Sequence, residues 1–361
     1  MSTKPRISIA MATYNGARYI REQLDSLAAQ TLLPYELVVT DDGSTDTTLE
    51  IVRNFSGGAL FPVRIHRNEN RLGYADNFLY AASLCKGNFI AFCDQDDVWM
   101  PEKLATCASA FDDPNVLLVV HVAQVTGSDL APTGEYFPKI NSDQMVSRLE
   151  GNPWRSALGF SMIFRVSLLD GFDVANRPCY RYASPHPILN HHDTCIYFIA
   201  HSLGTVAFLA TPLASYRRHE SNNSHGVQSK SWREYLASRI YASEDYYAHA
   251  AMAVEQRIEV LKEIKYRSLD PEVRARAENA CAHWGRFSSA LIQRVELHSY
   301  RCGFTRRLSI LASLALEGNF RAVNKGGFGV QGLLKDFIFG LFARHRTMKD
   351  GTETIRVNSR K

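Results

Sequence analysis

The sequence predicts an α/β protein, with a doubly wound and mostly parallel sheet that carries helices on both faces and is followed by a mainly helical C-terminal region. Two observations predict this class. Through the first hundred residues, short apolar runs alternate with stretches of helical periodicity, as a parallel sheet requires. From Ser231 onward strand signals become rare and helical spacing dominates. We therefore expect a sheet domain over 1–228 and a basic helical region over 229–361.

Each element follows from its own pattern. Apolar runs of strand length predict strands at Ile7–Met11, Glu36–Thr40, Val63–Ile65, Phe89–Cys93, Leu117–Gln124, Ser161–Arg165 and Val206–Ala210. Apolar residues three and four positions apart predict helices at Ala17–Gln30, at Tyr74–Leu84, near Thr194–Ser202, and through Leu49, Ile51 and Val52. Ser44 or Thr45 is the expected N-cap region of the helix through Leu49.

Polar clusters follow three of the predicted strands. Thr13-Tyr14-Asn15 follows the first strand, Asp41-Asp42 the second, and Asp94-Gln95-Asp96-Asp97 the fourth. Ligands bind beyond the carboxyl ends of the strands in such sheets. The three clusters therefore predict a single active site at one rim.

The cluster Asp94–Asp97 holds three carboxylates within four residues, directly after an apolar strand. Burying that much negative charge is prohibitive unless a positive group neutralises it. Carboxylates suit Mg²⁺ or Mn²⁺ held together with substrate phosphates. An isolated D-x-D is more often a solvated acidic loop, but here two other polar clusters accompany it.

Composition restricts the compartment. The seven cysteines are scattered without a C-x-x-C, which predicts free thiols in a reducing cytoplasm. The chain runs from Met1 straight into a strand, which leaves no room for a signal peptide.

The segment from Thr194 to Tyr216 lacks Lys, Arg, Asp and Glu, yet Gly204 and Pro212 interrupt it. We expect a helix and a strand there, without a membrane span.

The sequence contains an ordered set of motifs over roughly residues 5–226. They are Met11–Gly16, Asp41–Asp46, Asn70–Gly73, Asp94–Trp99 with Pro101–Leu104, His192-Asp193, and Tyr216–His219 with Asn223 and Gly226. This set resembles family 2 glycosyltransferases of the GT-A fold, and among them the bacterial rhamnosyltransferases that build surface polysaccharides. The helices after Ser231 lie outside the resemblance.

The resemblance implies how a nucleoside diphosphate sugar is bound. Asp94 and Asp96, with Asp97 nearby, would hold Mg²⁺ or Mn²⁺ on the diphosphate, where the cation acts as a Lewis acid. Asp41 is similar to the carboxylate that accepts the N3–H of uracil or thymine. Thr13 and Tyr14 would line the nucleoside pocket, with Asn15, Asp42 and Gln95 also in the nucleotide site. Arg71 would stack on the base or meet phosphate, and its alternative is a surface arginine.

The resemblance also implies the catalytic groups. Asp193 is similar to the general base that takes a proton from the acceptor hydroxyl, and its position at the start of an apolar helix also suits an N-cap role. His219 falls where the family has a histidine near the metal or diphosphate. A zinc site among His186, His191 and His192 is not expected, because no further ligand has the required spacing.

Three classes of function compete. The leading one is an inverting glycosyltransferase that moves a sugar, with dTDP-L-rhamnose as the favoured donor, onto a glycan or lipid-linked glycan acceptor. A UDP-hexose or UDP-N-acetylhexosamine is the alternative donor. A dinucleotide-dependent oxidoreductase is disfavoured, since Ala12–Gly16 is not a G-x-G-x-x-G turn. A non-catalytic nucleotide-sugar-binding protein is expected to lack Asp193 or the D-x-D.

The end of the chain is strongly basic. Residues 301–361 hold 12 Lys or Arg and 4 Asp or Glu, a local net of +8, whereas the whole chain has +4. An apolar stripe at helical spacing runs from Val330 to Phe342. It predicts either a helix packed on the enzyme's core or one lying on the anionic inner face of the plasma membrane. Nucleic acid is not an expected partner, because no reader motif accompanies the charge.

Overall fold

The computed structural model describes residues 5–150, 157–170, 191–220, 222, 244–299, 301–321 and 327–341. Its strands are β1 (Ile7–Thr13), β2 (Glu36–Asp41), β3 (Val63–Arg67), β4 (Phe89–Cys93), β5 (Val98–Trp99), β6 (Val116–Thr126), β7 (Pro132–Phe137), β8 (Gln144–Val146), β9 (Met162–Arg165) and β10 (Thr205–Arg217). Its α-helices are α1 (Ile20–Ala28), α2 (Thr48–Ser56), α3 (Tyr74–Ser83), α4 (Lys103–Ser109), α5 (His192–Leu203), α7 (Glu244–Arg267), α8 (Pro271–His298), α9 (Phe304–Leu316) and α10 (Gly329–Lys335). A π-helical segment, Asp336–Leu341, continues α10.

The strands form one ten-stranded sheet in the order β3-β2-β1-β4-β9-β6-β10-β5, with β7 beside β6 and β8 beside β10. The pairs β2–β3, β1–β2 and β1–β4 are parallel, as predicted. Beyond β4 the sheet is mixed, because β9 runs antiparallel to both β4 and β6. The prediction of an α/β sheet followed by helices is confirmed, but parallel pairing is confined to β3-β2-β1-β4 and to β6–β10.

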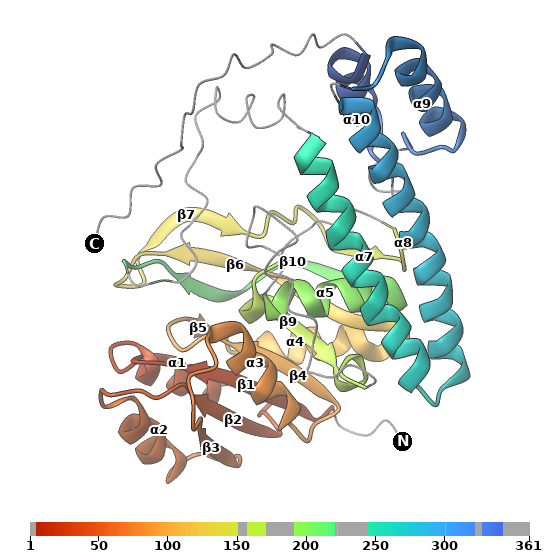
Figure 1. Ribbon diagram of the computed structural model, residues 1–361. Helices are drawn as coiled ribbons and strands as arrows, with labels where there is room; N and C mark the ends of the chain where they lie inside the picture. The colour runs from red at the N-terminus through yellow and green to blue at the C-terminus, as the bar shows by residue number, and fades with distance from the viewer. Residues whose placement is uncertain are drawn as a thin grey trace.

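Alternate residues of β1 reach the two faces of the sheet, as the two-residue period of a strand requires. Ile9 belongs to a core with Leu24 of α1 and Leu104 of α4. Ala10 belongs to a second core with Phe78 of α3 and residues of α5. Helices therefore cover both faces and leave the carboxyl ends of β1, β2 and β4 at one rim (Figure 1).

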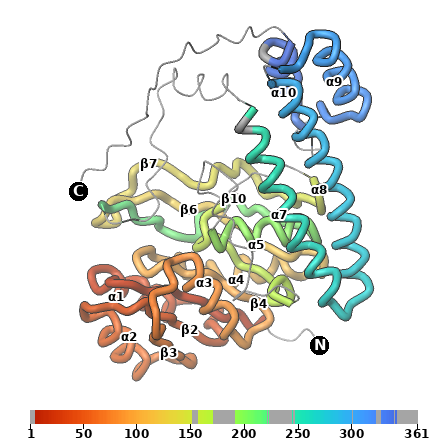
Figure 2. Tube along the Cα trace, viewed as in Figure 1, coloured from red at the N-terminus to blue at the C-terminus, as the bar shows by residue number. Residues whose placement is uncertain are grey.

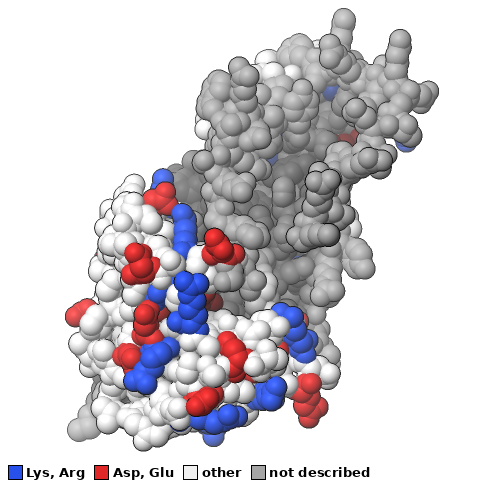
Figure 3. All heavy atoms as spheres, turned by 90° about the vertical axis from the view of Figure 1, so that its left-hand side faces the viewer, with Lys and Arg blue, Asp and Glu red and all other residues white. Residues whose placement is uncertain are grey.

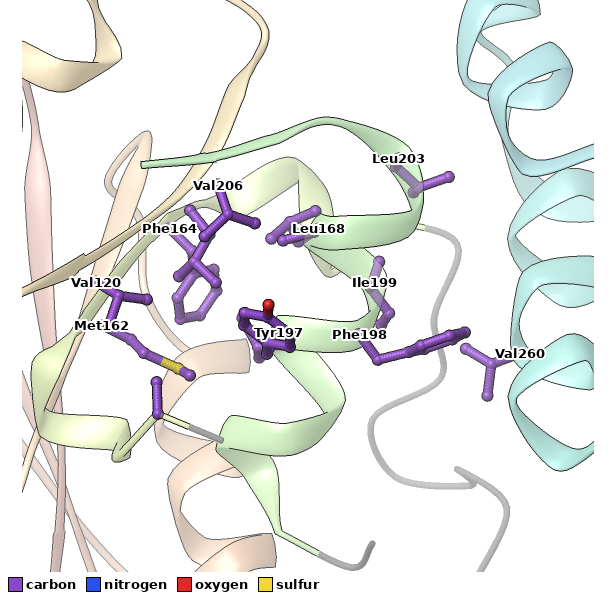
Figure 4. Packing of buried hydrophobic residues seen from close by; sticks show 14 of the residues in the cluster. Val120, Met162, Phe164, Leu168, Tyr197, Phe198, Ile199, Leu203, Val206 and Val260 are labelled. Atoms are coloured by element: carbon purple, nitrogen blue, oxygen red, sulfur yellow. The ribbon is translucent and has the colours of Figure 1, made fainter. Parts of the chain in front are cut away.

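The helical C-terminal region shares a core with the sheet. Helix α5 lies between the sheet and the α7–α8 hairpin, so that Phe198 turns toward Val260 of α7 while Tyr197 packs toward the sheet (Figure 4). The Trp284 ring of α8 lies 5.4 Å from the Phe198 ring, and its Nε1 donates a hydrogen bond to Ser202 Oγ at 3.0 Å. The predicted boundary between 1–228 and 229–361 falls outside the described residues.

Two local predictions are corrected. Helix α2 begins after Thr47, and its first N–H, from Thr48, is bonded by the Asp46 carboxylate at 3.0 Å. Ser44 does not cap this helix, because its hydroxyl donates to Asp41. The predicted helix from Val330 to Phe342 is α-helical only to Lys335 and then continues as the π-helical segment.

The segment from Thr194 to Tyr216 forms most of α5 and β10, as expected. Within the residues that the structure describes, no helix is both long enough and apolar enough to cross a membrane. The described side chains on the face drawn in Figure 3 carry basic and acidic groups interspersed, without a large region of one sign. Helices α9 and α10 lie at the end of the α7–α8 hairpin that is remote from β1–β4 (Figure 2).

Candidate functional site

A cavity of about 570 Å³ lies at the predicted rim. Most of the predicted site residues line it: Thr13, Tyr14, Asn15, Asp42, Arg71, Asp94, Gln95, Asp96, Asp193 and His219. Two predicted residues, Asp41 and Asp97, do not line it. The sequence motifs therefore converge in space as the strand topology predicts, and the two exceptions are informative.

The loop after β1 is fixed by the loop after β4. The side-chain amide of Gln95 accepts a hydrogen bond from Tyr14 N at 3.0 Å and donates one to Tyr14 O at 3.1 Å. A Cβ at Gly16 would lie 2.2 Å from Gln95 Oε1, so only glycine fits beside this contact. Asn15 has a positive φ of 48°, a conformation that asparagine tolerates. Gln95 thus joins two of the three predicted clusters.

Asp41 is buried and fully engaged, in contrast to its predicted role. Its Oδ1 accepts hydrogen bonds from Gly43 N at 3.2 Å and Ser44 N at 2.8 Å, and its Oδ2 accepts from the hydroxyls of Thr13 and Ser44. These donors occupy the roughly four acceptor positions of a carboxylate. Asp41 therefore shapes the turn after β2, and a base in the cavity has no access to it.

Asp42, the next residue, faces the cavity instead. Its carboxylate accepts from Leu72 N at 2.6 Å, Gly73 N at 2.8 Å and Asn68 Nδ2 at 3.1 Å, which leaves about one acceptor position. The Arg71 guanidinium lies 3.9 Å from Asp42 and 4.0 Å from the centre of the Tyr14 ring. One wall of the cavity is therefore formed by Asp42, Arg71 and Tyr14. It offers a hydrogen-bond acceptor, a cation and an aromatic face.

Another part of the cavity, lined by Asp94, Asp96 and Asp193, is acidic. Burial, together with the negative charges of Asp96 and Asp193, raises the pKa of Asp94 to about 8. Burial also raises the pKa of Asp193. Carboxylates that repel one another in this way are stabilised by a divalent cation. The electrostatics thus fit a site for Mg²⁺ or Mn²⁺.

Asp96 and His219 are the two side chains best placed to hold such a cation. His219 Nε2 lies 2.8 Å from Asp96 Oδ2, and both residues line the cavity. Among the described residues, no group of three or more His, Cys, Asp or Glu side chains is arranged to cage a metal ion. Asp96, His219 and the adjacent Asp94 would leave coordination positions for phosphate oxygens, as Mg²⁺ sites commonly do.

Asp97 lies behind the cavity wall. Its side chain is fully buried, and Oδ1 accepts from Arg217 N at 3.0 Å. Burial, followed by the charges of Asp96 and Asp94, raises its pKa well above the ordinary value, which favours the neutral carboxyl group. The predicted metal contact of Asp97 therefore finds no support in this geometry.

The sequence interpretation missed two buried basic side chains, Arg217, which supports the loop after β4, and Lys103. Arg217 Nε donates to Asp96 O at 2.8 Å, another guanidinium nitrogen donates to Glu22, and the guanidinium covers the Tyr19 ring. Lys103 Nζ donates to Phe160 O at 2.7 Å, and burial lowers its pKa to about 7. Arg217 belongs to the Tyr216–His219 motif, but the motif alone does not say which residue is buried.

Asp193 lies in the first turn of α5, after the N-cap His191. Its Oδ1 accepts from Thr194 N at 2.6 Å, and no described residue other than Thr194 donates a hydrogen bond to it. The Tyr74 hydroxyl hydrogen-bonds to the His191 ring, and burial with the charges of Asp193 and Asp94 raises the Tyr74 pKa to about 12. Asp193 is therefore a helix-terminal carboxylate that faces the cavity.

The sheet order, the helices on both faces and a polar cavity at the strand ends define an α/β domain of the GT-A type. The UDP-GlcNAc complex of residues 1–349 of S. aureus TarS has this fold, with a TM-score of 0.50 and 20% identity over 88% of this chain and 93% of that one.

Residues 8–172 match the family described as glycosyl transferase family 2. The glycosyltransferase alr2836 of Nostoc sp. is 30% identical over 60% of this chain and 66% of its own length. EpsH of Bacillus subtilis, also named a glycosyltransferase, is 29% identical over 64% of this chain and 67% of its own. The chain thus spans about two thirds of the length of these relatives.

Proposed function

We propose that this protein is a metal-dependent, inverting glycosyltransferase that moves a sugar from a nucleoside diphosphate donor onto a glycan or lipid-linked glycan. One observation carries the proposal. A cavity at the strand ends brings together an acceptor for a base (Asp42), an acidic pair with a histidine (Asp94, Asp96 and His219), and a further carboxylate (Asp193). Glycosyl transfer needs these three groups, for base recognition, diphosphate neutralisation and deprotonation of the acceptor.

In the proposed donor complex, Asp42 takes the role that the family resemblance implied for Asp41. The remaining acceptor position of Asp42 suits the N3–H of uracil or thymine, whereas cytosine has no N3–H. Tyr14 and Arg71, which already stack at 4.0 Å, offer planar surfaces for the base or a charge for phosphate. Thr13, Asn15 and Gln95 contribute by holding the loops after β1, β2 and β4 in place, as their hydrogen bonds indicate.

Asp94, Asp96 and His219 would hold Mg²⁺ or Mn²⁺ against the diphosphate. When bound, the cation supplies Lewis-acid stabilisation of the leaving diphosphate. Arg217 fixes the position of Asp96 through its backbone carbonyl, so it acts as a positioning residue.

Asp193 is the proposed general base. Thr194 occupies its Oδ1, which leaves Oδ2 to accept the proton of the acceptor hydroxyl. Burial raises the pKa of Asp193, which increases its basicity relative to an exposed aspartate. The acceptor oxygen would then attack the anomeric carbon from the face opposite the leaving diphosphate, with inversion.

The identity of the donor sugar is proposed from the similarity of this chain to other proteins. The sequence resemblance favours dTDP-L-rhamnose, whereas the TarS structure is a complex with UDP-GlcNAc. Asp42 is compatible with both, because uracil and thymine share the N3–H. A thermal-shift screen of nucleoside diphosphate sugars with Mn²⁺ or Mg²⁺ ranks them, since a ligand that binds only the folded state stabilises it.

A nucleotide-sugar-binding protein without catalysis is the competing class. Both classes predict donor binding, so the distinguishing test is turnover. Release of nucleoside diphosphate from the best donor, with and without Mn²⁺, supports the enzyme. Tight donor binding without any hydrolysis or transfer to glycan acceptors would favour the binding protein.

A further inference from the structure

The helices at the remote end of the α7–α8 hairpin expose apolar side chains at helical spacing. On α9, Phe304 is 56% exposed, Leu308 51% and Leu316 89%. These positions are four and eight residues apart, so they lie along one side of the helix. We call them, with the residues of α10 described next, the distal apolar surface.

Helix α10 and its π-helical continuation repeat this pattern. Val330 is 69% exposed and Leu334 53%, and the next turn exposes Phe337 at 47% and Ile338 at 50%. Asp336, in contrast, is fully buried. Val330, Leu334, Phe337 and Ile338 of the predicted apolar stripe are therefore directed outward, whereas its Leu341 is buried and the Asp336 carboxylate is directed inward.

The inward side is held by polar contacts. Asp336 accepts a hydrogen bond from Arg294 Nε at 2.6 Å, and His298 Nε2 lies 3.2 Å from its other oxygen. The buried Arg307 of α9 donates to three carbonyls, those of Ser299, Cys302 and Gly340. A buried ion pair seldom stabilises a fold more than apolar packing does. The ion pair therefore fixes the orientation of these helices, and that orientation exposes the stripe.

The inward side of these helices is also partly apolar, because Ile310, Leu311 and Leu314 of α9 and Leu341 are buried. The exposed apolar side chains therefore occupy the outer side, which a helix packed on a soluble core normally keeps polar. The surrounding sequence is also basic, with a net of +8 over residues 301–361. Two copies of so basic a region repel each other, whereas an anionic surface attracts it. Exposed apolar side chains beside basic ones fit the interface of a negatively charged bilayer.

We propose that the distal apolar surface docks this protein on an anionic membrane surface. Phe304, Leu308, Leu316, Val330, Leu334, Phe337 and Ile338 enter the interfacial region, and exposed basic side chains, among them Arg301, Arg306 and Arg321, contact lipid head groups. The strands β1, β2 and β4, which are followed by residues that line the cavity, lie at the other end of the molecule from α9 and α10 (Figure 1).

The test compares two double variants of the full chain. Leu308→Ser/Leu334→Ser removes one exposed apolar side chain from each helix of the surface. Tyr266→Ser/Leu269→Ser is the matched control, because these side chains are 90% and 94% exposed at the opposite end of the hairpin. Co-sedimentation is measured with vesicles of phosphatidylglycerol and phosphatidylcholine, and with phosphatidylcholine alone. A melting curve and donor binding are recorded for each variant.

We expect the wild-type chain and the control to bind anionic vesicles, and added salt to weaken that binding. Leu308→Ser/Leu334→Ser should bind anionic vesicles at least about tenfold more weakly than the wild-type chain. Its melting curve and its donor binding should be unchanged. The proposal is overturned if the wild-type chain ignores anionic vesicles at low salt, or if the control loses as much binding. It is also overturned if the wild-type chain is a dimer in solution that the first variant separates. If the wild-type chain binds no nucleoside diphosphate sugar, that result contradicts the proposed function and not the membrane proposal.

Discussion

At the scale of single residues, neighbouring aspartates have different environments and should behave differently on mutation. Asp41 is saturated by hydrogen bonds from Thr13 and from its own turn, and Asp42 faces the cavity. Asp94 and Asp96 lie together in the acidic part of the cavity, and Asp97 is buried behind it. The charge of each aspartate therefore has a separate consequence, for folding, for donor binding or for cation binding.

Asp42→Asn should weaken the binding of uridine and thymidine nucleotides about tenfold or more, because a charge-assisted acceptor for N3–H is lost. Asp41→Asn should chiefly lower the melting temperature, since four hydrogen bonds converge on that carboxylate. Calorimetric titration with UDP and dTDP, together with melting curves, compares the two. If Asp41→Asn weakens binding in a fully folded protein while Asp42→Asn does not, the assignment is reversed.

Asp193→Asn should keep donor affinity and lower the rate of transfer on the order of a thousandfold, because the amide cannot accept the acceptor's proton. The matched control is Thr194→Val, which removes one of the two hydrogen bonds that Asp193 receives but leaves its charge. Its rate should fall only a few fold. Near wild-type transfer by Asp193→Asn would leave Asp193 with a structural role alone.

Asp94→Asn should stabilise the metal-free protein at neutral and higher pH. The folded-state pKa of about 8 lies above the ordinary 3.8, so the folded state holds this proton more tightly than the unfolded state. The ionised group therefore costs stability as pH rises from about 4 to about 8. In EDTA at pH 8 the variant should melt about 2 °C or more above wild type, and the difference should vanish near pH 4. A lower melting temperature at pH 8 would contradict the burial of this charge.

At the scale of elements, the site depends on contacts between loops that are distant in sequence. Gln95, after β4, bonds both backbone polar groups of Tyr14, after β1. The apolar runs of β1, β2 and β4 could be predicted from sequence because a buried strand is apolar throughout. The choice between Asp41 and Asp42 could not, since adjacent residues at a strand end point in different directions and composition does not say which one faces the cavity.

Gly16→Ala should displace Gln95, because the new Cβ would lie 2.2 Å from Gln95 Oε1. The loss of two hydrogen bonds should destabilise the fold by about 1–2 kcal/mol and weaken donor binding. Gly58→Ala is the control, since a Cβ there meets nothing within 4 Å. Thermal unfolding and donor titration of both variants measure these two effects. Equal melting temperatures for Gly16→Ala and wild type would show that Gln95 does not hold this loop.

At the scale of the whole molecule, the sheet and the helical region share one core, which residue patterns in either part could not reveal. Phe198 and Trp284 meet across the predicted boundary. The outward stripe of α10 was equally hidden, because sequence periodicity identifies an apolar face but not what it faces. Arg294 and His298 orient that helix from another element. Pattern therefore predicted which elements exist, and packing between distant elements decided their orientation.

The central claim is that the cavity transfers sugar with a cation held by Asp96 and His219. The most direct measurement is nucleoside diphosphate release and product formation by wild type and Asp96→Ala, with Mn²⁺ and with excess EDTA. We predict that wild type loses activity in EDTA and recovers with Mn²⁺, and that Asp96→Ala is slower on the order of a thousandfold at saturating Mn²⁺. Full wild-type activity in EDTA, or an Asp96→Ala variant that turns over at the wild-type rate, would contradict the claim.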